Sequence, residues 1–369
     1  MKKMKLRSLF LTVLCGLMVA AGFTSCSDDD VDNSWKEGAK VSLPEYRAFV
    51  LSEGSYQKNN SHLFYVNPAT DAPYASDIYE AQNGKKLGDT ANDMVAVKGN
   101  IYVVVNVSKL LLKLNGSGVE VARYSFDDTL GEPRYIYGDD AGKLYVSSYG
   151  GYVSRFDAET LKLEASVKVD ANPEEIAVNH DGLFVVCSGY GAGNTICHID
   201  LNTFDKAESI KTVNNPQRLV EANNRLYILA GSPTYNPENY DYSTAVYSFD
   251  SFSHETKYIA DATKIFASGE NLYYANSVSP DWVNYTTSFN VYNYNTEQTS
   301  TWNLTNAPAA LSSSVVYMIE QNPYDNSFYI GTTNYSENST VYHFSKDGNF
   351  IGQFDAGGIN ANTMVFLKR

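Results

Sequence analysis

Cysteine and histidine are scarce in this sequence of 369 residues, which holds four cysteines and five histidines. No pair of them has the spacing of a zinc or iron site, so we expect no metal centre. The nucleophile-elbow pattern GxSxG, the protease pattern HExxH and the P-loop are also missing. We do not expect adjacent Glu174 and Glu175 to form a glycosidase pair, because neighbours on a strand point apart, so that one faces the channel and one packs between blades. We therefore expect no catalytic residues, no cofactor and no enzyme activity.

Basic residues are in the minority, with 28 Lys and Arg against 42 Asp and Glu. Residues 1–25 contribute four of the basic residues and none of the acidic ones, so 24 basic residues remain against 42 acidic ones without that segment. This balance opposes binding to phosphate backbones or to anionic membrane surfaces. We expect no nucleic-acid partner.

The N-terminus carries a short apolar run with a basic start, "MKKMKLRSLFLTVLCGLMVAAGFTSC". The run is too short and too early for a spanning helix, and it predicts a signal peptide over residues 1–25. "FTSC" resembles the lipobox of bacterial lipoproteins, which implies cleavage before Cys26 and acylation of that cysteine. The following "SDDD" resembles the acidic signal that exports Bacteroidetes lipoproteins to the outer face of the outer membrane. An ordinary secretory signal is the alternative.

Residues 26–45 have no periodicity and several acids, so they are predicted to be a lipidated, flexible tether. The membrane contact would then be through the lipid alone. Downstream, Cys187 and Cys197 lie in "FVVCSGYGAGNTICHID", on two runs that resemble the arms of one hairpin. We expect them near opposite one another and joined by a cross-strand disulfide, with two buried free thiols as the alternative.

Short β-type runs repeat through the rest of the chain, among them "RAFVLSEG", "NIYVVVN", "KLYVSSYG", "GLFVVCSG", "RLYILAG", "NLYYANS" and "SFYIGTT". Each is followed by an alternating strand and preceded, across a turn, by one more short strand. The first apolar residues of those preceding strands, Met94, Ile136, Ile176, Leu219 and Ile265, are 42, 40, 43 and 46 residues apart. Four short strands in a repeat of this length are typical of a β-propeller blade.

Seven such repeats predict one all-β domain over residues 46–369, a seven-bladed β-propeller of four-stranded antiparallel blades. The first repeat begins with the second strand of a blade, and the C-terminal "NANTMVFLKR" matches a first strand. We expect this C-terminal strand to complete the N-terminal blade, with residues 363–367 beside residues 47–51, and so to close the ring. No segment predicts a helix.

Tyrosines gather in the loops between second and third strands, most densely in "SPTYNPENYDYSTAVYSFD". In a blade these loops open on the same face as the entries to the first strands. Tyrosine provides a rigid apolar face and a hydroxyl together, which suits a large, partly flat, polar ligand. The alternative is that the rings only pack the loops. The expected ligand-binding residues are Tyr56, Tyr149, Tyr190, Tyr235, Tyr240, Tyr242, Trp282, Tyr285 and Tyr335 in the loops, and Arg134, Tyr135, Glu175, Arg218 and Lys264 at the channel mouth, where the basic side chains would meet a phosphate.

The blades, especially "EPRYIYGDDAGKLYVSSYGGYVSRFDAETLKL" and "NPEEIAVNHDGLFVVCSGYGAGNTICHIDLNTF", resemble the YncE-like seven-bladed propellers of Bacteroides lipoproteins. With the lipobox, "SDDD" and "FVLSEGSYQKNNSHLFYVNP", residues 26–369 are similar to the surface cobalamin-binding lipoproteins of the BtuG type. The resemblance implies capture of vitamin B12 and related corrinoids at the cell surface, and their delivery to a TonB-dependent outer-membrane transporter. A surface propeller for a glycan or a protein partner is the alternative.

Overall fold

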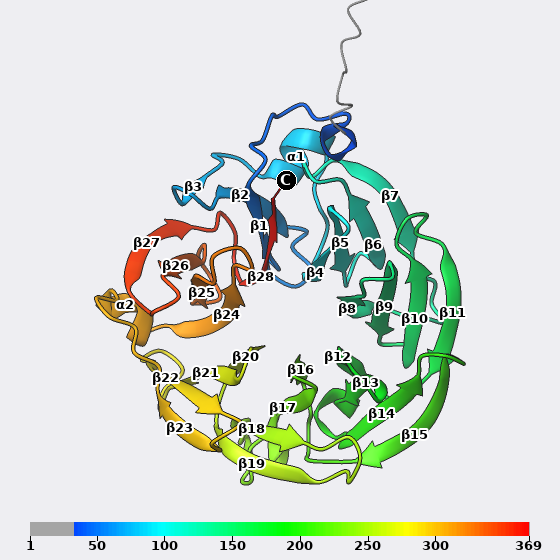
Figure 1. The fold of residues 1–369 in the computed structure, drawn as a ribbon, viewed down its shortest axis with the longest axis vertical. Helices are drawn as coiled ribbons and strands as arrows, with labels where there is room; N and C mark the ends of the chain where they lie inside the picture. Colours follow the sequence, from blue (N-terminus) through cyan, green and yellow to red (C-terminus); the bar gives the residue numbers. More distant parts are fainter. Residues whose placement is uncertain (1–32, 369) are drawn as a thin grey trace, which may run out of the picture. The chain divides into compact units, whose positions relative to one another are not determined.

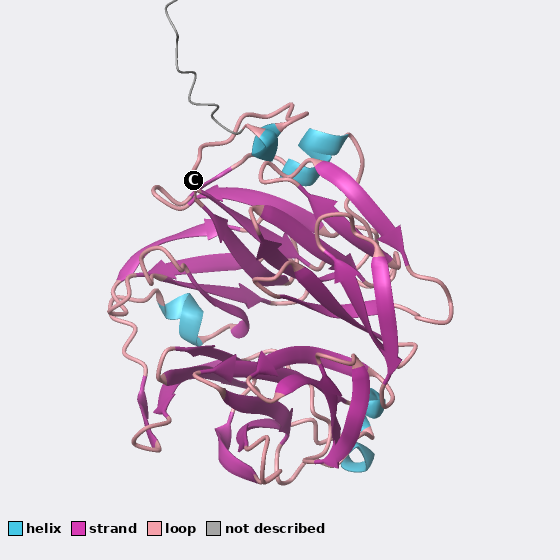
Figure 2. Ribbon diagram, turned by 45° about the vertical axis from the view of Figure 1, so that its right-hand side comes forward, coloured by secondary structure: helices cyan, strands magenta, loops and turns pink. Residues whose placement is uncertain are grey.

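Seven antiparallel sheets of four strands form a closed ring in the computed structural model, which describes residues 33–368 (Figures 1 and 2). The innermost strand of each sheet contacts the innermost strands of the sheets before and after it. The structure is therefore the predicted seven-bladed β-propeller. The predicted signal peptide and Cys26 lie outside the described residues.

The blades are numbered 1 to 7 along the chain, and blade 1 takes its innermost strand from the C-terminus. The innermost strands, from blade 1 to blade 7, are β28 (Ala361–Leu367), β4 (Ala91–Val97), β8 (Pro133–Gly138), β12 (Pro173–Asn179), β16 (Arg218–Ala222), β20 (Lys264–Ser268) and β24 (Val315–Gln321). The second strands are β1 (Arg47–Ser52), β5 (Asn100–Val105), β9 (Lys143–Ser148), β13 (Gly182–Cys187), β17 (Arg225–Gly231), β21 (Asn271–Val278) and β25 (Phe328–Thr333). The third strands are β2 (His62–Asn67), β6 (Leu110–Leu114), β10 (Tyr152–Asp157), β14 (Thr195–Asp200), β18 (Thr244–Phe249), β22 (Thr286–Asn293) and β26 (Thr340–Phe344). The outermost strands are β3 (Ala72–Pro73), β7 (Glu120–Ser125), β11 (Leu163–Lys168), β15 (Asp205–Lys211), β19 (Thr256–Asp261), β23 (Gln298–Thr301) and β27 (Phe350–Asp355).

The ring closes where the two ends of the described chain meet in blade 1. Strand β28 pairs with β1, which places Leu367 opposite Arg47 and Thr363 opposite Leu51. This is the predicted pairing. Because β28 also contacts β4 and β24, the circle has no unpaired inner edge.

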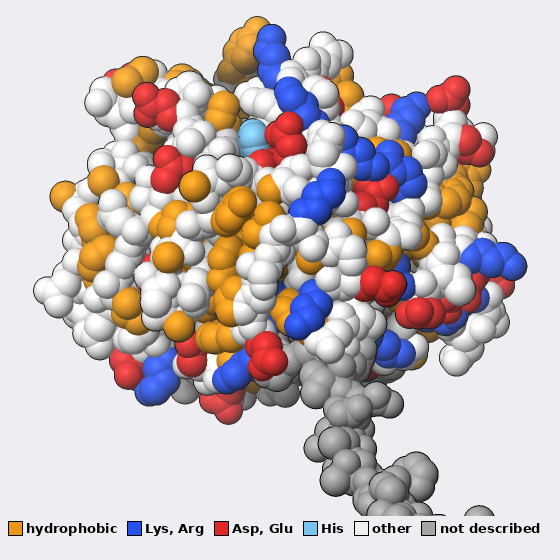
Figure 3. Space-filling view, turned by 90° about the horizontal axis from the view of Figure 1, so that it is seen from above, with side chains coloured by type: hydrophobic (Ala, Val, Ile, Leu, Met, Phe, Trp, Pro, Cys, Tyr) orange, Lys and Arg blue, Asp and Glu red, His pale blue; other side chains and the backbone are white. Residues whose placement is uncertain are grey.

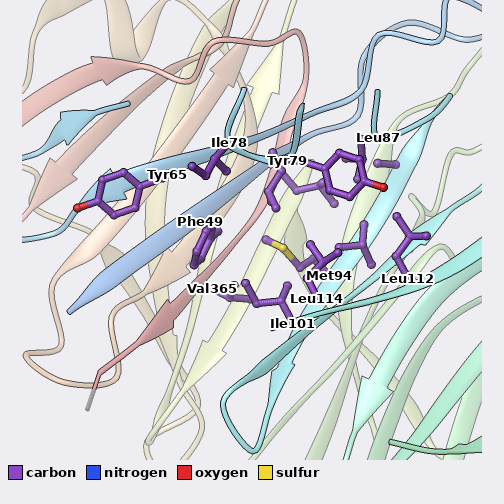
Figure 4. Packing of buried hydrophobic residues seen from close by; sticks show 14 of the residues in the cluster. Phe49, Tyr65, Ile78, Tyr79, Leu87, Met94, Ile101, Leu112, Leu114 and Val365 are labelled. Carbon is purple, nitrogen blue, oxygen red and sulfur yellow. The ribbon is translucent and has the colours of Figure 1, made fainter. Parts of the chain in front are cut away.

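The hydrophobic core lies between the blades. Inner strands such as β1 and β13 are buried at every position, whereas the outer strand β7 alternates between half-buried and exposed residues. A strand with a blade on each face has two buried faces, which explains why the repeats appear in the sequence as continuous apolar runs. Figure 4 shows the packing between blades 1 and 2, where Phe49 and Val365 meet Met94 and Ile101.

Residues 34–45 differ from the predicted tether, because they pack against blades 1 and 2. The segment begins with a 3₁₀ turn, η1 (Ser34–Lys36), whose Trp35 is buried with the Arg47 guanidinium 3.9 Å from its ring centroid. The side-chain carbonyl of Gln82 accepts hydrogen bonds from the backbone N–H groups of Lys40 and Val41, at 2.8 and 2.9 Å. One buried tryptophan and a few backbone hydrogen bonds fix this segment without any repeating pattern.

The expectation of no helix is also wrong, although the helices are short. Helix α1 (Ile78–Asn83) begins after Asp77, whose carboxylate accepts from the backbone N–H of Glu80, and ends at Gly84 in the left-handed region. Helix α2 (Ala309–Ser312) and the 3₁₀ turns η2 (Gly189–Gly191) and η3 (Pro237–Asn239) are shorter still. Helices of three to six residues cannot show a helical period in the sequence. No helix within residues 33–368 is long and apolar enough to cross a membrane.

The predicted disulfide between Cys187 and Cys197 is not formed in the structure, where both thiols are free and buried. In the hairpin of β13 and β14, Cys187 lies opposite Thr195 and Cys197 lies opposite Val185. The two cysteines are therefore diagonal neighbours, with their sulfur atoms 3.9 Å apart. Diagonal positions on paired strands are about 7–8 Å apart at Cα, which is farther than a disulfide bridges without backbone movement.

Candidate ligand-binding face

One face of the disc is hollowed into four adjoining cavities. Three of them, of about 480, 440 and 420 Å³, lie among the loops that join second to third strands. The fourth, of about 210 Å³, lies between the first strands and is called the throat below. Shared lining residues connect the four: Arg134 and Arg218 join the throat to the first cavity, and Tyr317 joins it to the other two. We call this connected surface the tyrosine face.

The structure brings thirteen of the fourteen predicted ligand-binding residues to the tyrosine face. The cavity of about 480 Å³ is lined by Arg134, Tyr135, Tyr149, Tyr190, Arg218, Tyr235 and Tyr242; the cavity of about 440 Å³ by Tyr240, Tyr242, Trp282, Tyr285 and Tyr335; the cavity of about 420 Å³ by Tyr56, Arg134, Tyr149 and Tyr335; and the throat by Arg134, Tyr135, Arg218 and Lys264. Glu175 is the exception. Three of the longer loops between second and third strands lie in blades 4 to 6.

Four aromatic residues of the loops have backbone conformations that side chains other than glycine rarely adopt. Tyr190, Tyr240, Trp282 and Tyr335 have φ angles of 57°, 57°, 62° and 63°. They occupy the loop after the second strand in four successive blades, 4 to 7. A bulky residue in the left-handed region is uncommon and carries backbone strain. The rings nevertheless stand out into solvent, with Tyr190 87% and Trp282 74% exposed.

Other tyrosines of the face are held by hydrogen bonds to neighbouring loops. Tyr235 donates from its hydroxyl to the carbonyl of Gly191, at 3.0 Å, and so ties the blade 5 loop to the blade 4 loop. Tyr149 donates to a carboxylate oxygen of Glu174, at 3.1 Å. These two rings are therefore fixed in place by contacts within the protein.

Irregular strand pairing aims several side chains into the mouth of the channel. The register shifts between Pro133 and Ile136 in β8, and between Pro173 and Ile176 in β12. A bulge redirects the side chains of the extra residues, and here it turns Arg134 and Glu174 toward the same cavity. Glu174 is therefore a lining residue that the sequence-based selection omitted.

The arginines of the mouth already have counter-ions within the protein. Arg134 Nε lies 2.7 Å from a carboxylate oxygen of Glu174. Arg218 donates two hydrogen bonds of 2.8 Å to the two carboxylate oxygens of Glu175. A bidentate pair of this kind neutralises both groups. The two arginines that we expect to meet a phosphate are thus already paired with acids.

Glu175 links blades 4 and 5 and lines none of the four cavities. Besides Arg218, its carboxylate accepts a hydrogen bond of 2.8 Å from the backbone N–H of Leu219, on the first strand of blade 5. Asp93 links blades 2 and 3 in the same way, because its carboxylate accepts a hydrogen bond of 3.0 Å from the backbone N–H of Ile136. The prediction that one of the two adjacent glutamates packs between blades is confirmed, with Glu175 in that place and Glu174 in the mouth.

Charged groups lie in the throat and beside it: Lys264 lines this cavity, and Asp93 and Glu320 act electrostatically on its amine. Lys264 is 8% exposed, and burial lowers the pKa of its amine. Burial likewise raises the pKa of the Glu320 carboxyl, and it raises that of Asp93 to about 6. Tyr317 donates a hydrogen bond of 2.6 Å to Glu53, and burial raises the pKa of that phenol well above its usual range. Ionisation is costly here because water is excluded.

Glu53, Tyr317 and Asn362 also line the throat and were missed by the sequence-based selection. Tyr317 and Asn362 come from the first strands of blades 7 and 1, whose repeats were not included in the measured spacing. Extending that spacing to "VVYMIEQ" and "ANTMVFL" would have found them. Within residues 33–368, no group of three or more His, Cys, Asp or Glu side chains could hold a metal ion.

The surface charge is mixed on the side of the molecule that Figure 3 shows. Where the rim is seen near α1, basic and acidic side chains alternate with apolar ones (Figure 3). Neither sign dominates this side of the molecule.

Solved structures with a similar fold come from proteins of different kinds. A proposed 6-phosphogluconolactonase of Bacteroides fragilis is similar with a TM-score of 0.58 and 11% identity, over 90% of this chain and 99% of that chain. A functionally unknown protein of Desulfotomaculum acetoxidans is similar with a TM-score of 0.58 and 13% identity, over 88% and 99% of the two chains. A catalytically inactive variant of virginiamycin B lyase from Staphylococcus aureus, solved with quinupristin, is similar with a TM-score of 0.54 and 11% identity, over 79% and 94%.

These identities are low enough that the likeness shows the propeller fold alone. No protein-family model matches the chain, and no match was found among curated proteins. The function must therefore be argued from the face itself.

Proposed function

We propose that this protein is a surface lipoprotein that captures vitamin B12 and related corrinoids on its tyrosine face and passes them to a TonB-dependent outer-membrane transporter. The lipid on Cys26 would hold the propeller at the outer face of the outer membrane. The protein would act by binding, without catalysis or a cofactor of its own.

The observation that carries the proposal is the set of left-handed aromatic residues. Tyr190, Tyr240, Trp282 and Tyr335 keep exposed rings at backbone positions where glycine or asparagine would fit with less strain. Strain of this kind persists at sites where it serves recognition. Flat rings are exposed in this way in four blades, each at a cost in backbone strain. This repetition favours a broad ligand with apolar faces.

The size of the tyrosine face agrees with such a ligand. Single ligand pockets usually measure about 300–1,000 Å³. Here three cavities of about 480, 440 and 420 Å³ adjoin a throat of about 210 Å³. A corrinoid spans several such cavities at once, because it has a wide ring with a nucleotide loop below it.

The polarity of the face also agrees. Since Arg134 and Arg218 are paired with acids, the face presents mainly tyrosine hydroxyls and side-chain amides, among them Asn215 and Gln217. Groups of this kind exchange neutral hydrogen bonds with the amide arms at the edge of a corrin ring. A rigid scaffold makes those bonds with little ordering cost.

The test is direct, because corrinoids are coloured. Purified protein mixed with cyanocobalamin at equal concentrations of about 10 μM should elute from gel filtration as one coloured species. Calorimetry should then give a Kd far below that concentration. A colourless protein peak would refute the corrinoid proposal.

The location is tested separately. The Cys26→Ala variant should be released from membranes, while protease added to intact cells should digest the unchanged protein. Protein that is protected until the cells are lysed would rule out the surface location.

One observation favours a glycan as a second candidate. The ring of Trp282 is 74% exposed at the edge of the cavity of about 440 Å³, where it could stack on a sugar face. Binding of soluble polysaccharides, with cyanocobalamin excluded, would favour this candidate.

A further inference from the structure

Residues 34–45, called the strap below, are bound to the rim of the propeller. The strap lies beside α1, at blades 1 and 2 (Figure 1). Its Leu43 is buried in the core between these two blades. Gln82 of α1 bonds to the strap backbone at both ends of its amide, since its carbonyl accepts from Lys40 and Val41 and its nitrogen donates to the carbonyl of Val41, at 2.8 Å. The strap is therefore part of the folded domain.

The strap begins on the side of the disc opposite the tyrosine face. Trp35 packs on the guanidinium of Arg47, which is the first residue of β1. The side-chain nitrogen of Asn115 donates to the carbonyl of Glu37, at 2.9 Å, and Arg47 Nε donates to the carbonyl of Gly116. Asn115 and Gly116 lie in the turn between β6 and β7. Turns from third to fourth strands open on the opposite face, so the chain enters the disc there.

The length of chain between the expected lipid and the strap is short. Cys26 and Ser34 are eight positions apart, and an extended chain spans at most about 28 Å over that distance. A strand of six residues such as β1 is about 20 Å long. The tyrosine face therefore lies about that much farther from the lipid than the start of the strap does. Turning this face to the membrane would use most of the available length.

Charge gives the disc no attraction to a membrane that would override the position of the lipid. Without residues 1–25 the chain has 24 basic residues against 42 acidic ones, which opposes contact with anionic head groups. Exposed rings such as Tyr190 and Trp282 would favour the reverse orientation, because tyrosine and tryptophan partition into membrane interfaces. These rings lie in blades 4 and 6, across the ring from the strap.

We propose that the lipid anchor holds the propeller by the face opposite the tyrosine face, at the rim of blades 1 and 2, so that the four cavities open away from the membrane. This orientation deepens the proposed function and rests on it in one respect, because it requires the lipid on Cys26. A ligand then reaches the cavities directly from the medium. Delivery to a protein in the same membrane requires the disc to turn over, and the strap restrains that movement.

The first test measures how far each face lies from the lipid. Lys58→Cys places a label on the tyrosine face, in the loop between β1 and β2, and Lys98→Cys places one on the opposite face, in the turn between β4 and β5. Both positions are exposed, both belong to blades 1 and 2, and both variants lose one lysine. Cys187 and Cys197 are buried and should stay unlabelled. The lipidated protein is inserted into phosphatidylcholine vesicles that contain an acceptor dye on their head groups.

Energy transfer from the label to the vesicle surface should be stronger from position 98. The distance of closest approach should be at least about 10 Å longer for position 58, which is half the length of a six-residue strand. Equal distances, or a shorter one for position 58, would overturn the orientation. The matched control is Cys26→Ala with either label, which should show no transfer. Equal transfer with and without the lipid would also overturn the proposal.

The second test loosens the strap. Trp35→Ala removes its buried ring, so the restraint on the disc should weaken and the difference between positions 58 and 98 should fall by at least half. Trp302→Ala is the matched control, because both tryptophans are 7% exposed and Trp302 lies in blade 6, away from the strap. It should keep the full difference. Thermal unfolding verifies that both variants are folded. A full difference in Trp35→Ala would show that the strap does not orient the disc.

Orientation and corrinoid capture fail in different ways. If the unchanged protein binds cyanocobalamin in gel filtration but the two labels lie equally far from the lipid, the orientation is refuted while capture stands. If cyanocobalamin does not bind but position 98 lies nearer the lipid, capture is refuted while the orientation stands.

Discussion

Polar side chains on the two faces of the disc differ in how far they are hydrogen-bonded within the protein. On the face opposite the tyrosine face, the turns between third and fourth strands bond to themselves: Asp157 accepts from the backbone N–H of Thr160, and Asp250 accepts from that of Ser253. These bonds lower the pKa of both carboxyls, that of Asp157 to about 2. On the tyrosine face, the buried side-chain oxygen of Asn362 makes no hydrogen bond. A polar group that the fold has already paired is less available to a ligand.

The faces also differ in how bulky residues with left-handed backbone conformations are used. The turns of the opposite face place Asn223 there, a residue type that tolerates a positive φ, and also Leu161 and Phe204, whose side chains are buried in the core. The tyrosine face places Tyr190 and Trp282 there with their rings exposed to solvent. Packing in the core accounts for the bulky residues of the opposite face and does not account for the exposed rings, so we infer that these rings are kept for another purpose.

The largest effect should come from replacing two of those aromatics with glycine. In the double variant Tyr190→Gly and Trp282→Gly, cyanocobalamin affinity should fall at least about 30-fold, because each aromatic anchor in a binding site is commonly worth about 2 kcal/mol and the two contributions are not fully additive. The melting temperature should stay the same or rise, since glycine relieves strain at a positive φ. Calorimetry and thermal unfolding measure the two quantities.

This result separates binding from packing. If the rings only packed the loops, the double variant would lose stability and any loss of affinity would follow from unfolding. If the double variant bound cyanocobalamin as well as the unchanged protein does, the exposed rings would have no role in binding, and the inferred difference between the two faces would be wrong.

The next effect concerns the ion pairs that surround the mouth. Replacing Glu175 with Gln leaves the guanidinium of Arg218 without its counter-ion in a largely buried place, so the free energy of unfolding should fall by about 2–3 kcal/mol. Replacing Glu297 with Gln, which breaks an exposed pair with Lys257 on the rim, should change it by less than about 0.5 kcal/mol. Urea unfolding of both variants tests the contrast, and equal losses would contradict it.

A smaller effect should appear in how stability depends on pH. The pKa of Glu320 is raised in the folded protein by burial, so the folded state favours the protonated carboxyl. Stability from this group is therefore fully present below its unfolded pKa and is lost as the pH rises through the folded pKa. Glutamine mimics the protonated form. Glu320→Gln should match the unchanged protein near pH 5 and exceed it by about 1 kcal/mol at pH 9, where one unit of pKa shift corresponds to about 1.4 kcal/mol.

Two groups near Glu320 also affect how stability depends on pH. Asp93 acts in the same direction as Glu320, because its pKa is also raised. Lys264 acts in the opposite direction, since a lowered amine pKa makes stability rise with pH. Both Glu320→Gln and the unchanged protein contain Asp93 and Lys264. The difference in their free energies of unfolding at each pH therefore cancels the contribution of Asp93 and most of that of Lys264. A variant that loses stability at pH 9 would show that attraction to Lys264 outweighs burial.

The sequence was sufficient for the fold because the propeller is set by repeating local patterns. The spacing from Met94 to Ile265 predicted the blades, and the strand order at the two ends predicted that Leu367 lies beside Arg47. The loops that carry Tyr190 and Trp282 followed from the same counting, because every second loop of a four-stranded blade opens on one face.

The repeat spacing does not predict features that depend on the exact strand register or on a single buried residue. The bulge in β12 exchanged the expected roles of Glu174 and Glu175, because a shift of one residue redirects every side chain after it. The register of the hairpin also decides the position of the two cysteines, because Cys187 lies opposite Thr195 and is only a diagonal neighbour of Cys197. The packing of residues 34–45 depends largely on Trp35, which belongs to no repeat.

The smallest effect is expected on the opposite face, at its most exposed aromatic residue. Phe252 is 93% exposed in the turn between β18 and β19. Its backbone N–H donates to the carboxylate of Asp250, so the turn keeps its shape whatever the side chain is. Single exposed apolar residues are common and need no function.

Phe252→Ser should therefore leave the free energy of unfolding within about 0.5 kcal/mol and the cyanocobalamin Kd within about twofold. Calorimetry beside the Tyr190 and Trp282 double variant gives the sharpest contrast, since aromatic rings of similar exposure are removed from the two faces. A marked loss of affinity in Phe252→Ser would mean that exposure alone, and not the tyrosine face, governs binding.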